Sequence, residues 1–378
     1  MKFTCTRKDI VEAIQVVSKG LAPAKSDQPM LSTIYLHAHD TILEVQTNNY
    51  EIGVVYYLPA TVDEPGKIAL SGKYFQEVIR KLPDDIVRIS YDDESHLATI
   101  RSGAANFTLL SLDAELFPVV EELKDGELKC TLSSDVFNSL VKQTVSACST
   151  SDSRPIFTGC NLQIDGTKLS MQATDTHQLA LKNAEIEDAI DTQGETKSLI
   201  IPAKTLSGVM KDSTLGGLYT DIKIVSDYKQ IGFEFDNIYI RSRLIEGNFP
   251  SLDNVIPEDF STEVTVKIAS LLNAVDRVSL ISREDQLRIV NLDFKMGEVH
   301  ISSDNKEVGS AEEIIPIKID GAEIKIAFDS RFLLNALKAL NGEFGRLSIA
   351  GDLRPMMLRE KENEDFRYVI TPVRTNEE

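Results

Sequence analysis

The residues whose types and spacing could best support catalysis lie in segment 173–180, which reads A-T-D-T-H-Q-L-A. It places Asp175 and His177 two positions apart, flanked by the hydroxyls of Thr174 and Thr176. A hydroxyl, an imidazole and a carboxylate form a hydrolytic site only when hydrogen bonds join nucleophile, base and orienting acid in series. Residues 168–174 are predicted to form a strand, so Asp175 and His177 can pair at its end but leave no activated nucleophile. A hydrolase and a loop without catalysis both stay open at this point.

Composition narrows the class of protein. The chain has 378 residues, enough for two to four domains. No uncharged apolar run approaches the roughly 20 residues of a membrane span, and the start M-K-F-T-C-T-R-K-D lacks the apolar stretch of a signal peptide. We therefore expect no membrane partner and a cytoplasmic location. The four cysteines are widely spaced and are expected to be reduced, mostly buried thiols: Cys5, Cys130, Cys148 and Cys160.

The histidines give a weak indication of metal binding. His37 and His39 would share one face of a strand. Because the sequence shows no third ligand near them, the pair favours two surface histidines over a metal site. We expect no metal and no other cofactor.

A repeat organises the chain. A strand followed by a helix begins at Phe3, Cys130 and Val264, and a second such segment begins at Lys67, Ser198 and Ile324. The spacings lie close to one third of the chain, which indicates three copies of one domain. Each helix is expected to begin at a polar cap such as Ser134 or Ser330.

The segments between these helices alternate apolar and polar residues, as half-buried antiparallel strands do. Examples are residues 41–47, 86–91, 221–226, 231–235 and 237–242. Two helices packed on antiparallel sheets, repeated three times, predict an α+β fold. Acidic segments without a core pattern place the boundaries near 125 and 255, giving domains 1–125, 126–256 and 257–378.

Charge is divided unevenly between the helices and the rest of the chain. The net charge is −19, which argues against a nucleic-acid partner if it is spread evenly. The six predicted helices, however, carry twelve Lys or Arg against five Asp or Glu, so they sum to +7 and the remainder to −26. Cations on equivalent helices of repeated domains would form one basic surface suited to phosphates without base readout.

Three diverged copies, cationic helices and A-T-D-T-H-Q-L-A together resemble the β sliding clamps, the processivity subunits of bacterial DNA polymerase III. Further matching stretches are L-F-P (116–118), L-I-E-G-N-F-P (244–250) and Y-V-I-T-P-V-R (368–374). The resemblance implies a non-catalytic protein that tethers polymerase to DNA. It also implies a head-to-tail homodimer, in which two chains of three domains close a six-domain ring around duplex DNA.

The resemblance also assigns residues. The contact between subunits is expected at Phe107, Leu109, Leu280 and Ile281. A pocket for short peptide motifs of DNA polymerase, clamp loader and repair proteins is expected at Phe157, Thr174, Thr176, His177, Gln178, Leu179, Pro250, Val255, Pro355, Val369 and Thr371. The residues expected to contact DNA are the helix cations Lys73, Arg80, Lys142, Lys204, Lys211, Arg277 and Lys338, together with Lys25 and Arg154 in loops.

The chain departs from the family pattern at three pocket positions. Clamps commonly carry arginine where this chain has Gln178, methionine where it has Thr371, and glycine where it has Thr176. These changes predict a more polar pocket with an altered peptide preference. Two rivals to the clamp remain: a hydrolase that uses Asp175 and His177, and a repeat scaffold that binds proteins but never encircles DNA.

Overall fold

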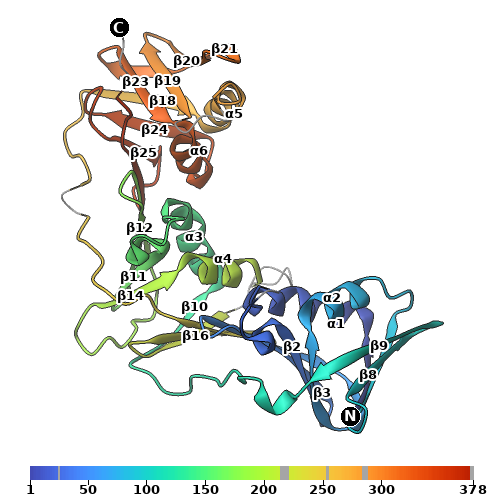
Figure 1. Cartoon of the computed structure of the whole chain (residues 1–378). Helices are drawn as coiled ribbons and strands as arrows, with labels where there is room; N and C mark the ends of the chain where they lie inside the picture. The colour runs from blue at the N-terminus through green and yellow to red at the C-terminus, as the bar shows by residue number, and fades with distance from the viewer. Residues whose placement is uncertain (24–25, 213–220, 253–254, 283–287, 375–378) are drawn as a thin grey trace. The chain divides into compact units, whose positions relative to one another are not determined.

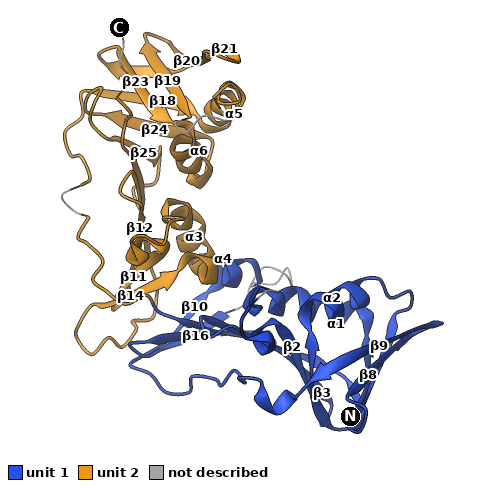
Figure 2. Ribbon diagram, in the orientation of Figure 1, with its two compact units in different colours: residues 1–135, 208–244 blue, residues 136–207, 245–378 orange. Residues whose placement is uncertain are grey.

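The computed structural model describes residues 1–23, 26–212, 221–252, 255–282 and 288–374. The chain folds into two compact units, one of residues 1–135 with 208–244 and the other of residues 136–207 with 245–378 (Figure 2). Each unit combines helices with antiparallel sheet (Figure 1). The expected α+β class is therefore confirmed.

All six predicted strand–helix segments are present. They are β1 (Lys2–Thr6) with α1 (Arg7–Val17), β6 (Gly66–Ser71) with α2 (Gly72–Arg80), β10 (Leu128–Ser133) with α3 (Ser134–Thr144), β14 (Lys197–Pro202) with α4 (Ala203–Asp212), β18 (Thr262–Lys267) with α5 (Ile268–Val278), and β23 (Ile324–Asp329) with α6 (Ser330–Ala339). The cap predicted at Ser330 is wrong, because the Asp329 side chain accepts the Arg331 N–H at 2.9 Å. Ser330 is instead the first helical residue and is buried.

The remaining strands of the first unit are β2 (Thr33–His39), β3 (Ile42–Asn48), β4 (Ile52–Pro59), β5 (Thr61–Glu64), β7 (Ile86–Asp92), β8 (Leu97–Ser102), β9 (Ala105–Leu112), β15 (Asp221–Ser226), β16 (Gln230–Phe235) and β17 (Ile238–Arg243). They join in one sheet in the order β10-β15-β16-β17-β4-β3-β2-β6-β9-β8-β7-β1-β5. The pairing of β17 with β4 continues the sheet from the second copy of the repeat into the first. The predicted strands that fall in this unit are confirmed.

Helix α1 covers part of this sheet by packing against β3 and β4. Its apolar residues recur every three or four positions, so one stripe of the helix is buried: Ile10, Ala13, Ile14, Val16 and Val17. The Thr6 side chain caps the helix by accepting the Asp9 N–H at 3.1 Å. Local sequence and packing therefore agree on where this helix begins and which face it buries.

The remaining strands of the second unit are β11 (Gly159–Asp165), β12 (Lys168–Thr174), β13 (Gln178–Glu185), β19 (Ile289–Lys295), β20 (Glu298–Asn305), β21 (Gly309–Pro316), β22 (Lys318–Gly321), β24 (Phe344–Ile349), β25 (Met356–Glu360) and β26 (Phe366–Ile370). One sheet has the order β14-β11-β12-β13-β26-β25-β24-β18-β22, and a second has the order β21-β20-β19-β23. The β13–β26 pair joins the second copy of the repeat to the third. Helix α5 packs against α6, β20 and β21, and α6 also packs against β26.

Two further expectations can be compared with the structure. All four cysteines are free thiols, and three of them are buried: Cys5, Cys148 and Cys160. Of the helices in the described ranges, none has both the length and the apolar character to span a membrane.

Candidate functional sites

The loop after β12 is held by its own side chains. One carboxylate oxygen of Asp175 accepts the backbone N–H groups of His177 and Gln178 at 2.8 and 2.9 Å. The Thr174 hydroxyl donates to the Gln178 carbonyl at 2.7 Å and accepts the Thr176 N–H at 3.1 Å. Asp175 therefore orders a tight turn between β12 and β13.

These contacts do not connect a hydroxyl, an imidazole and a carboxylate in the order that catalysis requires. The His177 ring stacks on Phe332 of α6, with ring centroids 5.7 Å apart and planes 12° apart. Within the described part of the chain, the imidazole makes no hydrogen bond to the Asp175 carboxylate or to either flanking hydroxyl. The series of hydrogen bonds that a hydrolase needs is not formed, so Asp175 and His177 act as structural residues.

Gln178 lies at the centre of a buried polar network. Its side-chain N–H group donates to Asp175 Oδ2 at 2.8 Å and to the Ser146 carbonyl at 3.3 Å. Its side-chain oxygen accepts the Tyr368 hydroxyl at 2.8 Å and the Asn335 amide at 3.4 Å. Because Gln178 is buried and its amide is engaged on both sides, it adds no polar surface to the predicted pocket. Burial also raises the pKa of Tyr368, so its hydroxyl stays a donor.

An apolar cluster lies on the same two strands as this network, β13 and β26. Leu179 on β13 pairs with Val369 on β26, and Val369 pairs in turn with Met357 on β25. The buried members of the cluster are Leu179, Leu181, Leu252, Met357 and Val369, with Phe249, Ile256 and Phe260 packed against them. Leu252 and its neighbours belong to the irregular segment between β17 and β18. We refer to these eight residues as the β13/β26 cluster.

The structure gathers several of the predicted pocket residues at this cluster. Leu179 and Val369 belong to it, and Phe157 meets the cluster residue Phe249 edge-on with centroids 6.2 Å apart. Thr371 donates its backbone N–H and its hydroxyl to the His177 carbonyl at 2.9 and 3.1 Å, which joins the loop to the end of β26.

Exposure separates the predicted pocket residues into two groups. The buried ones are Phe157, Thr174, Gln178, Leu179 and Val369, and the exposed or half-buried ones are Thr176, His177, Pro250, Val255, Pro355 and Thr371. Only the second group offers surface to a partner.

Three residues that sequence reasoning missed belong to the same place: Phe249, Leu252 and Met357. The run M-M-L at 356–358 is buried at every position, which is typical of a strand covered on both faces. That run could have drawn attention to Met357. Leu252 lies in a segment without secondary structure, so no periodic signal marks it.

The predicted DNA-contacting cations that the structure describes all have exposed side chains: Lys73, Arg80, Lys142, Arg154, Lys204, Lys211, Arg277 and Lys338. Lys25 lies outside the described residues. Lys142 donates to Asn341 at 3.2 Å. In the described ranges, Lys73, Arg80, Lys204 and Lys338 are engaged in no ion pair.

Other cations on the helices are engaged within the protein. Arg277 forms a two-pronged ion pair with Glu313 at 3.0 and 2.5 Å, which raises the pKa of the guanidinium. Lys19 pairs with the buried Asp212, whose pKa is nevertheless raised because burial outweighs the ammonium. The positive charge counted over the helices therefore overstates the charge available to phosphates, because Lys19 and Arg277 each have a carboxylate partner.

The residues predicted for subunit contact lie at or near exposed strand edges. In the described structure, residues 105–110 of β9 pair with β8 on one side only. Phe107 on this edge is 39% exposed. Strand β21 is the edge of its own sheet and packs against α5, and Leu280 follows α5 with 56% of its surface exposed. Leu109 and Ile281 are half-buried. Large apolar side chains at open edges are unusual unless a partner covers them.

The structure corrects one expectation about metal ligands. Glu44 on β3 lies beside both His37 and His39, so a third candidate ligand is present where the sequence suggested none. The antiparallel register places His37 directly opposite Glu44.

Three domain models of one protein family match the chain in order. Residues 1–121, 131–251 and 253–374 match the models of the N-terminal, central and C-terminal domains of the DNA polymerase III beta subunit. The chain is 34% identical to the beta sliding clamp of Bacillus subtilis, over 99% of this chain and 100% of that protein. It is 31% identical to the beta sliding clamp of Staphylococcus epidermidis, with the same coverage.

Solved structures agree with this relationship. The crystal structure of the Bacillus subtilis clamp superimposes with a TM-score of 0.89 at 33% identity and 99% coverage of each chain. The Pseudomonas aeruginosa clamp bound to griselimycin gives a TM-score of 0.89 at 25% identity, covering 99% of this chain and 100% of that one.

The repeated strand–helix units and the tandem domain matches define a three-domain protein of the DNA replication machinery. The chain belongs to the family of bacterial DNA polymerase III beta subunits, the beta sliding clamps. Its function is that of the family: it is a non-catalytic processivity factor of DNA polymerase.

Proposed function

We propose that two copies of this chain associate head to tail into a ring that encircles duplex DNA and tethers the replicative polymerase. The observation that carries the proposal is the unbroken order of three repeated units, matched from residue 1 to residue 374 by the three domains of one clamp family. The domain boundaries that we propose are 1–125, 126–256 and 257–378. A protein with this role works in the cytoplasm, where bacterial DNA lies.

The subunit contact that we propose joins the β9 edge of one copy to the β21 edge of the other. Both edges have unpaired backbone groups on one side within the described residues, so they can add to each other as antiparallel strands. Phe107, Leu109, Leu280 and Ile281 supply the apolar part of the contact. Because the two edges differ, the contact is heterologous, and the ring closes when it is made twice.

We propose that the ring is lined by helix cations, of which Lys73, Arg80, Lys204 and Lys338 are the leading residues. Their ammonium and guanidinium groups are exposed and engaged in no ion pair among the described residues. Lys142, Lys211 and Arg154 contribute to the same lining, and Lys25 joins them. Contacts of this kind read phosphates without base sequence, which allows the ring to slide.

We propose that the β13/β26 cluster is the floor of a docking site for short peptides of DNA polymerase, clamp loader and repair proteins. Val255, Pro355, Pro250 and His177 form the exposed rim, and apolar side chains over a buried apolar floor suit aliphatic or aromatic anchors. Thr371 and Thr176 add hydroxyls to the rim.

Topological retention tests the ring. The protein is loaded on nicked circular DNA with its cognate loader, washed in high salt, and the circle is then cut. We expect retention on the intact circle and release after cutting. Continued binding to the linear product, or loss from the intact circle in salt, would support the scaffold hypothesis in place of the ring.

A further inference from the structure

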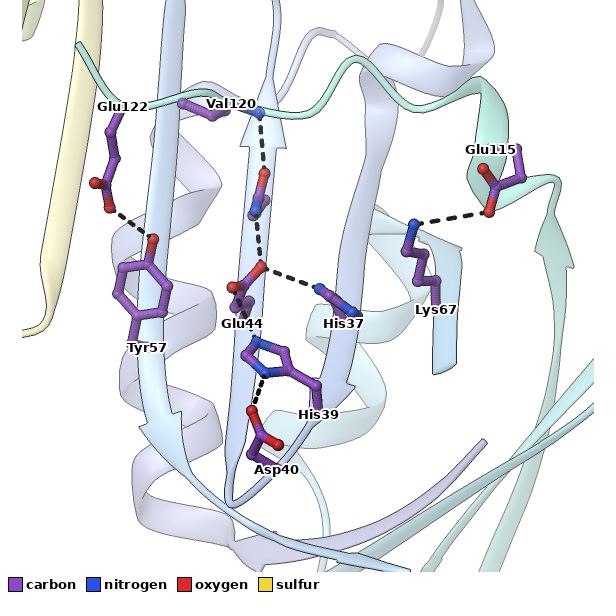
Figure 3. Close-up of polar contacts among 10 residues, drawn as sticks. His37, His39, Asp40, Glu44, Tyr57, Lys67, Glu115, Val120 and Glu122 are labelled. Atoms are coloured by element: carbon purple, nitrogen blue, oxygen red, sulfur yellow. Dashed lines mark hydrogen bonds and ion pairs between the residues drawn. The ribbon is translucent and has the colours of Figure 1, made fainter. Parts of the chain in front are cut away.

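Two histidines and a glutamate form a cluster near the turn of the β2–β3 hairpin. The proposed clamp function does not use this cluster. His37 and His39 are two positions apart on β2, so both side chains lie on one face of the strand, and Glu44 projects from β3 onto the same face (Figure 3). The Glu44 carboxylate lies 3.3 Å from His37 Nδ1 through one oxygen and 3.0 Å from His39 Nε2 through the other. The two imidazole rings are 4.6 Å apart between centroids.

We propose that His37, His39 and Glu44 bind a divalent transition-metal ion of the zinc type. The candidate ligand atoms, one from each side chain, all lie within 4.8 Å of one another. Metal–ligand bonds of about 2.0–2.2 Å in a tetrahedral site separate the ligand atoms by about 3.3 Å. Each imidazole nitrogen already lies near this distance from a different oxygen of Glu44. Small side-chain rotations therefore bring both nitrogens and one carboxylate oxygen within bonding distance of a single ion.

Neighbouring side chains orient the ligands as they do in known metal sites. Asp40 Oδ2 lies 3.1 Å from His39 Nδ1, so with an ion bound at Nε2 the Nδ1–H group would donate a hydrogen bond to Asp40. Gln46 donates to Glu44 Oε2 at 3.2 Å and holds that carboxylate toward the histidines. A carboxylate that accepts a hydrogen bond from one ring nitrogen raises the basicity of the other nitrogen, which is the one that binds the metal.

The second contact of Gln46 connects the cluster to a longer segment. Its side-chain oxygen accepts the Val120 N–H at 3.1 Å, in the irregular stretch that follows β9 and precedes β10 (Figure 3). An ion bound at Glu44 would therefore stabilise the position of this stretch through one side chain. The three ligands keep 20–31% of their side-chain surface exposed, which leaves room for water at a fourth position.

A second histidine between carboxylates provides the contrast. His300 lies 2.8 Å from Glu298 through Nε2 and 3.2 Å from Glu312 through Nδ1. Its two carboxylates approach opposite ring nitrogens, so one ion cannot bind all three groups. The proposal therefore depends on two imidazoles converging on one carboxylate, and His300 offers a matched control.

The test is calorimetric titration of ZnCl₂ into the full-length protein after treatment with a chelator. We expect one saturable site per chain in the parent protein. In His37→Ala and in His39→Ala the affinity for Zn²⁺ should be at least about 100-fold weaker. Asp40→Asn should weaken binding about tenfold, since it removes the charge that orients His39. Asparagine tolerates the positive φ of 50° at this position, so the turn is kept. His300→Ala should bind as the parent protein does.

Co²⁺ absorption gives an independent measurement, because ions held by nitrogen ligands in a tetrahedral site absorb far more strongly than the hydrated ion. Circular dichroism checks that each variant is folded, and Glu44→Gln replaces any alanine variant that is not. The proposal is overturned if the parent protein shows no saturable site, or if the His37→Ala/His39→Ala double variant binds Zn²⁺ as tightly as the parent.

Discussion

The Tyr368 hydroxyl donates a 2.8 Å hydrogen bond to the side-chain oxygen of Gln178 within the second unit. The two residues lie on adjacent strands β26 and β13, and the bond is buried. It sets the direction of the Gln178 amide, whose other end then reaches Asp175 and holds the loop of residues 175–177. The loop that we propose as part of the pocket rim therefore depends on a buried hydrogen bond.

Tyr368→Phe tests this dependence. Removing the hydroxyl leaves the Gln178 oxygen with only the longer contact from Asn335, so the free energy of unfolding should fall by about 1 kcal/mol. The chain has no tryptophan, so chemical denaturation is followed by far-ultraviolet circular dichroism. Tyr228→Phe, at a 70% exposed position, is the matched control and should leave the midpoint unchanged. Equal midpoints for both variants would show that the core bond contributes no net stability.

Thr176→Gly should stabilise the protein. Thr176 has a φ of 84°, in the left-handed region that a β-branched residue adopts at a cost of about 1–3 kcal/mol. Glycine adopts this conformation freely, and the net gain should be about 1 kcal/mol after its larger unfolded-state entropy is counted. Thermal unfolding measures the gain. Thr167→Gly, at a turn position without positive φ, should lower the unfolding temperature instead, and a rise there would contradict the explanation.

Periodicity explains how much of the fold could be predicted. The six helices and the strands at residues 86–91 and 221–226 follow directly from alternation and helical spacing, which depend on local sequence. The pairing of β17 with β4 and of β13 with β26 could not be predicted, because register between distant strands leaves no local pattern.

The candidate sites show the same division. The resemblance drew attention to residues 173–180, of which 175–177 form the loop between β12 and β13, but the sequence could not reveal that Gln178 is buried. It also could not show that Glu313 neutralises Arg277 or that Glu44 reaches His37, since both contacts join different elements. Residue type and spacing located the elements, whereas the exposure of each side chain depended on packing.

Leu280→Asp should convert the dimer to a monomer. The side chain is 56% exposed at the proposed subunit contact, and a buried unpaired carboxylate there would cost several kcal/mol at each of two equivalent contacts. Sedimentation should change from twice the 42.0 kDa chain mass to the chain mass itself. Leu353→Asp is a matched control, because Leu353 is also 56% exposed but lies between β24 and β25 and is not among the residues proposed for the contact. Dissociation of both variants would argue against a specific contact at Leu280.

Charge reversal at Lys204 and Lys338 should weaken binding to duplex DNA in a salt-dependent way. Each lysine that contacts a phosphate contributes about one unit to the slope of log K against log salt, so Lys204→Glu/Lys338→Glu should reduce the slope by about two. Fluorescence anisotropy with a labelled duplex measures this. Lys223→Glu is the control, because Lys223 lies on β15 and pairs with Glu234 at 2.8 Å. An unchanged slope in the double variant would exclude these lysines from the DNA surface.

Val255→Asp should reduce the affinity for a peptide that carries leucine and phenylalanine anchors. Val255 is 49% exposed beside the buried Leu252 of the β13/β26 cluster, and its amide donates to the Leu252 carbonyl at 3.0 Å. A carboxylate at this rim would lie against apolar anchors, and loss of about 1–2 kcal/mol corresponds to roughly 5- to 30-fold weaker binding. Fluorescence polarisation with a labelled peptide gives the affinity. Val308→Asp, 66% exposed in the turn between β20 and β21, should bind as the parent does. Equal affinity of the Val255 variant and the parent would move the docking site away from this cluster.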